Sequence, residues 1–189
     1  MSFKLNTNDI LCIYGGTGSG KTTLFNILFG EHKNFKGNIT IDSTALHQEK
    51  TMKNKVSFLF QESENQFVFP FIKDEYDFII SNSNDKSIRL KISEICEKFN
   101  VKLEDYFMRN FYELSAGERR IFQIAFCFST HAKYLILDEP AEFLETQLSN
   151  ILLNMIKTIK NKGILILTKY PGLYKDVCQM SLPLNFQND

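Results

Sequence analysis

The stretch from residue 15 to residue 23 decides the fold, and it consists of Gly15, Gly16, Thr17, Gly18, Ser19, Gly20, Lys21, Thr22 and Thr23. It fits the spacing G-x-x-x-x-G-K-[ST], which is typical of a phosphate-binding loop. The apolar run from Ile10 to Tyr14 precedes it and indicates a buried parallel strand, while Leu24 to Phe29 suit a helix. Strand, glycine loop and helix, in this order, are the context that the motif requires.

The chemistry that this loop predicts is the binding of a nucleotide. Glycines let consecutive backbone N–H groups turn inward around a phosphate, and the helix N-terminus adds its partial positive charge. We expect Lys21 to reach the β- and γ-phosphates and the Thr22 hydroxyl to bind Mg²⁺. The alternative is a glycine-rich turn without a ligand, which the complete motif in its context disfavours.

The composition is that of an ordinary globular domain. Of the 189 residues, 43% are hydrophobic and 23% are charged, and 22 basic residues balance 22 acidic ones. We therefore expect no nucleic-acid partner and no polybasic membrane patch. The four cysteines are widely spaced, which favours buried thiols in a reducing cytosol. No stretch reaches the roughly 20 apolar residues of a membrane span and no signal-peptide pattern is present, so membrane attachment is expected only through a partner.

Periodicity along the rest of the chain predicts alternating strands and helices. The expected strands are Phe3 to Leu5, Ile10 to Tyr14, Ile39 to Asp42, Val56 to Phe60, Tyr134 to Leu137 and Gly163 to Leu167. The expected helical segments are Asp74 to Phe107 with a polar break at Ser81 to Asp85, then Ser115 to Phe128 and Gln147 to Ile159. Ser115 and Glu118 have the spacing of a capping box. This alternation predicts an α/β fold with a parallel sheet covered on both faces.

Two carboxylates follow the apolar strand that ends near residue 137. Asp138 and Glu139 come where ligands bind in open α/β sheets, at the carboxyl ends of the strands. An aspartate there can hold Mg²⁺, and a second carboxylate can polarise an attacking water. The alternative is a solvated Asp-Glu-Pro turn, which the phosphate loop in the same chain disfavours.

The whole order of motifs resembles the ATP-binding cassette (ABC) ATPases over nearly the full chain. The stretch Leu114-Ser115-Ala116-Gly117-Glu118 resembles their LSGGQ signature, with Ala and Glu at two altered positions, and it lies 23 residues before Asp138 (138 − 115). The resemblance implies a P-loop NTPase with a mostly parallel sheet flanked by helices, plus a helical signature subdomain. We expect the core at about 1–72 and 130–189 and the subdomain at about 73–129.

Residue roles follow from the same resemblance. It implies that Ser115, Ala116, Gly117 and Glu118 contact the γ-phosphate of an ATP bound by a second cassette. It implies Mg²⁺ ligands at Thr22, Gln61 and Asp138, where Gln61 matches the glutamine of the Q-loop. It also implies catalytic roles for Glu139 as the base and for Lys21, Gln61 and Lys169.

The segment after Gln61 narrows the resemblance to the importer ATPases of energy-coupling-factor and cobalt-type transporters. Phe60 to Val68 are similar to their Q-x-P-x-[DN]-Q-[FL] pattern, with Ser63 in place of the proline. In that group this region forms the groove for helices of the membrane subunit. Phe67, Phe69, Phe71 and the acidic pair Asp74-Glu75 would supply an apolar groove with a charged rim. The alternative is that these aromatic residues are core of the subdomain.

Three features depart from the family pattern. The place of the adenine-stacking aromatic falls before Met1, so we expect its leading strand to be missing. Lys169 occupies the place of the switch histidine, and a lysine could pair with a γ-phosphate only as a point charge. The D-loop, S-A-L-D in the family, reads Glu142-Phe143-Leu144-Glu145. These differences indicate a reduced cassette.

The sequence therefore predicts an ATPase subunit of an ABC transporter. It would be cytoplasmic, attached to the membrane through a membrane-spanning subunit, and paired with a second cassette that is either identical or different. One alternative is a soluble ABC ATPase without a transport role. Another is a regulatory cassette that binds nucleotide with little turnover, which Lys169 and the missing adenine-stacking aromatic both suggest.

Overall fold

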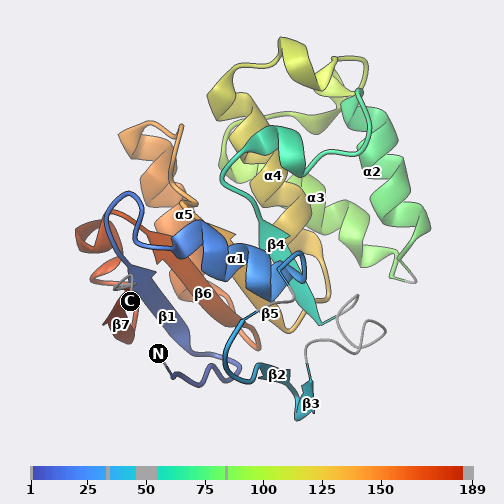
Figure 1. The fold of residues 1–189 in the computed structure, drawn as a ribbon. Coiled ribbons are helices and arrows are strands. Elements are labelled where there is room, and N and C mark those ends of the chain that lie inside the picture. The colour runs from blue at the N-terminus through green and yellow to red at the C-terminus, as the bar shows by residue number, and fades with distance from the viewer. Residues whose placement is uncertain (1, 33–34, 46–54, 84, 185–189) are drawn as a thin grey trace. The chain divides into compact units, whose positions relative to one another are not determined.

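The structure is a computed structural model, and it describes residues 2–32, 35–45, 55–83 and 85–184. The chain forms two compact units, each assembled from separate segments (Figure 1). The first unit consists of Met1–Phe58, His131–Pro140 and Ile156–Asp189, and the second of Leu59–Thr130 and Ala141–Met155.

A five-stranded sheet forms the centre of the first unit. Its strands follow the order β4-β5-β6-β1-β7, with bounds β1 Ile10–Tyr14, β4 Val56–Leu59, β5 Tyr134–Asp138, β6 Gly163–Thr168 and β7 Met180–Pro183. β1 runs parallel to both β6 and β7, and β5 runs parallel to β6. Every residue of β6 is buried, as a strand covered on both faces requires.

The strand register brings three carboxyl ends to one edge of this sheet. Tyr14 of β1 pairs with Thr168 of β6, and Asp138 of β5 pairs with Leu167 of β6. Because parallel strands end on the same side, the loops after β1, β5 and β6 leave the sheet together. This edge carries the candidate site.

Helix α1 (Lys21–Phe29) lies across one face of the sheet (Figure 1). Phe25 and Phe29 both meet the ring of Phe58 edge-on, with ring centroids 5.5 and 5.2 Å apart. Gly30 ends the helix in the left-handed conformation with φ of 97°, and its N–H bonds back to the last turn. These contacts fix the direction in which the helix leaves the phosphate loop.

The second unit is helical. It contains α2 (Ile72–Ser81), α3 (Ser87–Lys98), α4 (Ala116–Ser129), most of α5 (Thr146–Thr158), and the short 3₁₀ helices η2 (Ser63–Asn65), η3 (Leu103–Tyr106) and η4 (Phe111–Glu113). α3 packs on α4 through its apolar positions, among them the buried Ile88, Ile92 and Cys96. The predicted capping box at the start of α4 is confirmed.

One strand expected from the sequence is absent, and one strand of the sheet was missed. Phe3 to Leu5 form no strand, since β6 and β7 already occupy both edges of their would-be neighbour β1. β7 was not predicted, because it is an edge strand in which Met180 and Ser181 are exposed and the apolar pattern is weak. η5 (Pro171–Tyr174) lies between β6 and β7.

The strand expected at residues 39–42 is only β2 (Thr40–Ile41), paired antiparallel with β3 (Thr44–Ala45). In the part of the chain that the structure describes, none of the helices combines the length and the apolar character that crossing a membrane would require.

Candidate functional site

The predicted phosphate loop lies between the end of β1 and the start of α1. Gly20 is the N-cap of α1 in the left-handed conformation, with φ of 93°, and no side chain caps this helix end. The first turn of α1 also holds no acidic residue. The partial positive charge of the helix N-terminus is therefore not offset by a carboxylate of its own first turn, which favours an anion.

Two residues hold the loop in its compact shape. Lys21 Nζ donates to the carbonyl oxygens of Gly15 at 2.6 Å and Gly16 at 3.1 Å, so the lysine side chain folds back over the loop. A Cβ on Gly15 would lie 2.8 Å from the carbonyl oxygen of Leu184, so a larger residue there would displace the backbone. Thr22 and Thr23 are exposed in the first turn of α1.

Asp138 and Glu139 lie at the end of β5, and both are nearly inaccessible to solvent, at 3% and 4% exposure. Glu139 takes a positive φ of 44°, which is costly for a residue with a Cβ, by about 1 kcal/mol or more. Its backbone N–H donates to the carbonyl oxygen of Leu167 at 2.9 Å. The chain thus turns sharply after Asp138 and directs it toward the same edge as the phosphate loop.

The carboxylate of Glu139 is held by the end of β6. The Thr168 hydroxyl donates to Glu139 Oε2 at 2.9 Å, and the backbone N–H of Lys169 donates to Oε1 at 2.7 Å. The carbonyl oxygen of Thr168 in turn accepts the N–H of Gly15 at 3.2 Å. Thr168 was not singled out from the sequence, because a threonine at the end of an apolar strand carries no motif of its own.

Lys169 contacts Glu139 through its backbone N–H, and its side chain lies beside the ring of the next residue. Its Nζ lies 5.2 Å from the ring centroid of Tyr170, which is a cation–π distance. The side chain that the sequence placed at the switch position therefore has an aromatic partner next to it in the chain.

The residues of the first unit suit a magnesium ion. Mg²⁺ takes hard oxygen ligands and keeps several waters, so one carboxylate and one hydroxyl beside substrate phosphates are sufficient. Asp138 and Thr22 supply these two groups. Among the described residues there is no cluster of three or more His, Cys, Asp or Glu side chains placed to hold a metal. Gln61, the third expected ligand, belongs to the second unit.

The signature residues of the second unit begin α4. Ser115 is the N-cap, and its hydroxyl accepts the N–H of Glu118 at 3.2 Å, while the Glu118 carboxylate accepts the Ser115 N–H at 2.8 Å. Bonds from Ser115 are the main cause that holds the pKa of Glu118 below its ordinary value. Ala116 and Gly117 follow in the first turn, and a Cβ on Gly117 would lie 3.3 Å from the carbonyl oxygen of Phe143.

Gln61 donates from Nε2 to Glu142 Oε2 at 3.0 Å. The fully buried Arg120 of α4 donates to the backbone on both sides of this contact. Its Nη1 lies 2.6 Å from the carbonyl oxygen of Phe60, and its Nε lies 3.3 Å from that of Glu142. The same Nη1 donates to Gln123 Oε1 at 3.1 Å. The sequence analysis missed Arg120, although an arginine among the apolar residues of a helix is itself a signal of a buried network.

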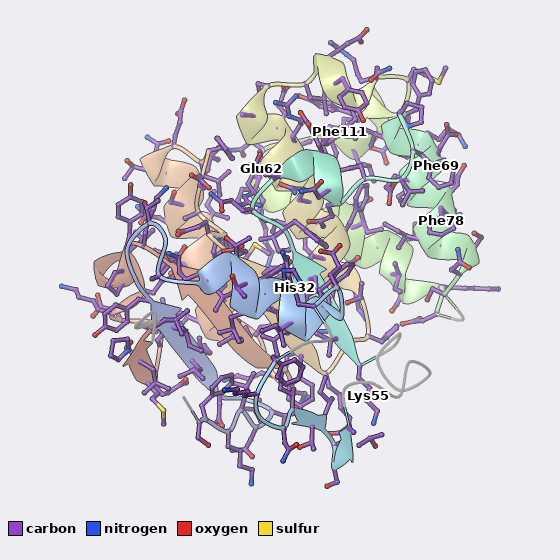
Figure 2. The ribbon with its side chains drawn as sticks, in the orientation of Figure 1. His32, Lys55, Glu62, Phe69, Phe78 and Phe111 are labelled. Carbon is purple, nitrogen blue, oxygen red and sulfur yellow. The ribbon has the colours of Figure 1, made fainter. Side chains whose placement is uncertain are left out.

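The aromatic residues after Gln61 divide between core and surface. Phe67 is half-buried and stacks on the buried Phe111, with ring centroids 3.8 Å apart. Phe69 lies against Phe78 of α2, as Figure 2 shows, while Phe71 is exposed. Glu75 is buried and does not belong to a charged rim. Burial thus removes Glu75 from the expected charged rim, while the groove itself stays a prediction.

Comparison with known proteins places the chain in a family. A family model described as "ABC transporter" matches residues 1–142. The chain belongs to the ABC transporter family.

Relatives of this ABC chain include an energy-coupling factor transporter ATP-binding protein of Aster yellows witches'-broom phytoplasma. It is 29% identical over 172 residues, which are 89% of this chain and 63% of the relative. A putative ABC transporter ATP-binding protein of Clostridium tetani is 30% identical over 173 residues, 89% of this chain and 39% of the relative. The chain thus spans less than two thirds of the length of both relatives.

A solved structure supports the ABC fold. CbiO1 of Clostridium perfringens, described as part of the ABC transporter complex cbiONQ, superimposes with a TM-score of 0.76 at 22% identity. The match covers 98% of this chain and 76% of that one. At this identity the likeness concerns the fold.

Proposed function

We propose that this chain is the ATP-binding and ATP-hydrolysing subunit of an ABC transporter. The proposal rests on one observation at the end of β6, where Thr168 is hydrogen-bonded both to the phosphate loop and to Glu139. The backbone of Thr168 bonds to Gly15, and its hydroxyl bonds to Glu139. A triphosphate held by the loop would thus meet a fixed carboxylate, which is the arrangement that phosphoanhydride hydrolysis needs.

The proposed reaction is an in-line attack of water on the γ-phosphorus of ATP. Glu139 takes a proton from the water, the water oxygen bonds to phosphorus, and the bond to the bridging oxygen breaks with its electron pair leaving on ADP. The Thr168 hydroxyl and the Lys169 backbone N–H each donate to one oxygen of Glu139 and so hold the carboxylate in place to receive this proton.

The phosphates would be bound by the backbone of residues 15–23 and by Lys21. For Lys21 to do so, its ammonium leaves the carbonyl oxygens of Gly15 and Gly16 for the phosphate oxygens. Thr22 and Asp138 would hold Mg²⁺, with Gln61 as a further ligand, and the ion would neutralise charge on the phosphates.

The proposed partners are a second cassette and a membrane-spanning subunit. Ser115 and Gly117 lie at the start of α4, where backbone N–H groups can bind the γ-phosphate of the second cassette. Ala116 and Glu118 would complete that contact. One of the relatives is named for an energy-coupling factor transporter, which favours attachment at the cytoplasmic face of a membrane.

A regulatory cassette with little turnover is the second candidate. The observation that favours it is Lys169, which occupies the switch position and whose ammonium lies 5.2 Å from the ring centroid of Tyr170. Such a protein would bind ATP and close without rapid hydrolysis.

Steady-state ATPase activity of the purified chain with Mg²⁺ separates these candidates. We expect Glu139→Gln to lower kcat at least about 100-fold while ATP still binds, and Lys21→Ala to abolish binding in a calorimetric titration. Unchanged affinity in Lys21→Ala would disprove the proposed nucleotide site. Binding without turnover in the wild type would instead support the regulatory cassette.

A further inference from the structure

Thr168 occupies a position that connects the two halves of the candidate site. It is the last residue of β6, fully buried, between the end of β1 on one side and the end of β5 on the other. Its carbonyl oxygen accepts the N–H of Gly15 at 3.2 Å. Its side chain points to the β5 side, where the hydroxyl donates to Glu139 Oε2 at 2.9 Å.

The direction of the Thr168 hydroxyl is fixed by a second bond. The backbone N–H of Tyr170 donates to Thr168 Oγ1 at 3.0 Å and so occupies one of its lone pairs. A hydroxyl has a single proton, and here that proton is committed to the carboxylate. The bond is buried, and a buried hydrogen bond to a charged group is worth more than one exposed to water.

The backbone of Glu139 is strained, so bonds to its carboxylate help to keep the side chain in place. Its φ of 44° is unfavourable, and Pro140 follows it, which restricts its backbone further. Without bonds at the carboxylate, the side chain could relax away from the strand end. Strained backbone conformations that the surrounding structure maintains occur often at active sites.

We propose that Thr168 is a positioning residue for hydrolysis, whose hydroxyl fixes the carboxylate of Glu139 in the orientation that receives the proton of the attacking water. This inference rests on the proposed function. Thr168 itself touches neither ATP nor water in the proposal. It acts through Glu139, and its backbone bond to Gly15 keeps that carboxylate in register with the phosphate loop.

Thr168→Val tests the hydroxyl alone, since valine keeps the shape and the backbone bond to Gly15. We expect kcat for ATP to fall about tenfold or more because the proton acceptor is misplaced, with KM changed less than about twofold. Thr168→Ser keeps the hydroxyl and should restore most of kcat. The control is Thr130→Val, which removes a hydroxyl bonded to the Cys127 carbonyl oxygen and should leave kcat unchanged.

A second measurement needs no nucleotide. In a double-mutant cycle of urea unfolding, Thr168→Val and Glu139→Ala should lower the midpoint by less together than the sum of their separate effects, since each removes the same bond. Additive midpoints, or full kcat in Thr168→Val beside an active wild type, would overturn the inference and leave the proposed function standing. If the wild type does not bind ATP, the proposed function and with it the catalytic role of Thr168 fail, while the cycle still decides whether the bond exists.

Discussion

Glu75 is a buried carboxylate that serves the backbone rather than a ligand. It lies in the first turn of α2, and one of its oxygens, Oε2, accepts the N–H groups of Val68 at 2.8 Å and Phe69 at 3.1 Å. Burial raises the pKa of Glu75 above its ordinary value, and the two backbone bonds offset part of this rise. One residue thus fastens the segment after the Q-loop to α2.

The pKa shift predicts how stability depends on pH. An acid whose pKa is raised in the folded state favours folding while it is protonated, so stability is lost as pH rises from the ordinary pKa through the raised one. Glu75→Gln keeps an oxygen acceptor without the charge. Its stability relative to the wild type should therefore be greater at pH 7 than at pH 4 in urea unfolding.

Glu75→Ala is the matched variant, since it removes the acceptor as well. It should destabilise the protein by about 1–2 kcal/mol at both pH values, because the backbone N–H groups of Val68 and Phe69 lose their acceptor. If the free energy of unfolding of Glu75→Gln relative to the wild type were the same at pH 4 and pH 7, burial of the charged form of Glu75 would not be destabilising.

At the scale of elements, α4 organises the second unit. Its N-terminus carries the signature residues, and its second turn carries Arg120 and Gln123, which bond to segments far away in the chain. Gln66 joins this network, since its Oε1 accepts from the Phe60 N–H at 3.2 Å and its Nε2 donates to the Gln123 carbonyl oxygen at 3.2 Å. The helix therefore holds the Q-loop on its flank.

Arg120→Met should destabilise the protein by about 3 kcal/mol, because three oxygens, on Phe60, Glu142 and Gln123, lose the donor that the fully buried Arg120 supplies. Urea unfolding measures this loss. The neighbouring Arg119 provides the control, since its guanidinium lies 5.7 Å from the ring centroid of Phe111 and its buried Nε has no hydrogen-bond partner. Arg119→Met should cost about 1 kcal/mol or less. Equal losses in the two variants would show that the network is not what stabilises this helix.

On the scale of the whole molecule, the sequence predicted the features that are local in the chain. The strand, loop and helix around Lys21, the capping box at Ser115 and the strand ending at Asp138 each depend on neighbouring residues, and periodicity or motif reveals them. Contacts across long stretches of chain leave no such pattern. Thr168 on Glu139 and Arg120 on Phe60 are of this kind, and β7 is identified only through its pairing with β1.

The last prediction concerns the assembly. In the proposed function two cassettes enclose two ATP molecules, and hydrolysis reopens them, so a variant that binds ATP without cleaving it should remain closed. Glu139→Gln removes the proton acceptor but keeps one of the two oxygens, which can still accept from Thr168 or from Lys169. We expect ATP with Mg²⁺ to shift this variant to a dimer in analytical ultracentrifugation, by mass action on the ATP-bound form. Glu139→Gln combined with Lys21→Ala should stay monomeric, since it lacks the phosphate contact. If Glu139→Gln alone saturates with ATP and remains monomeric, the result would contradict a homodimer and would point to a different second cassette.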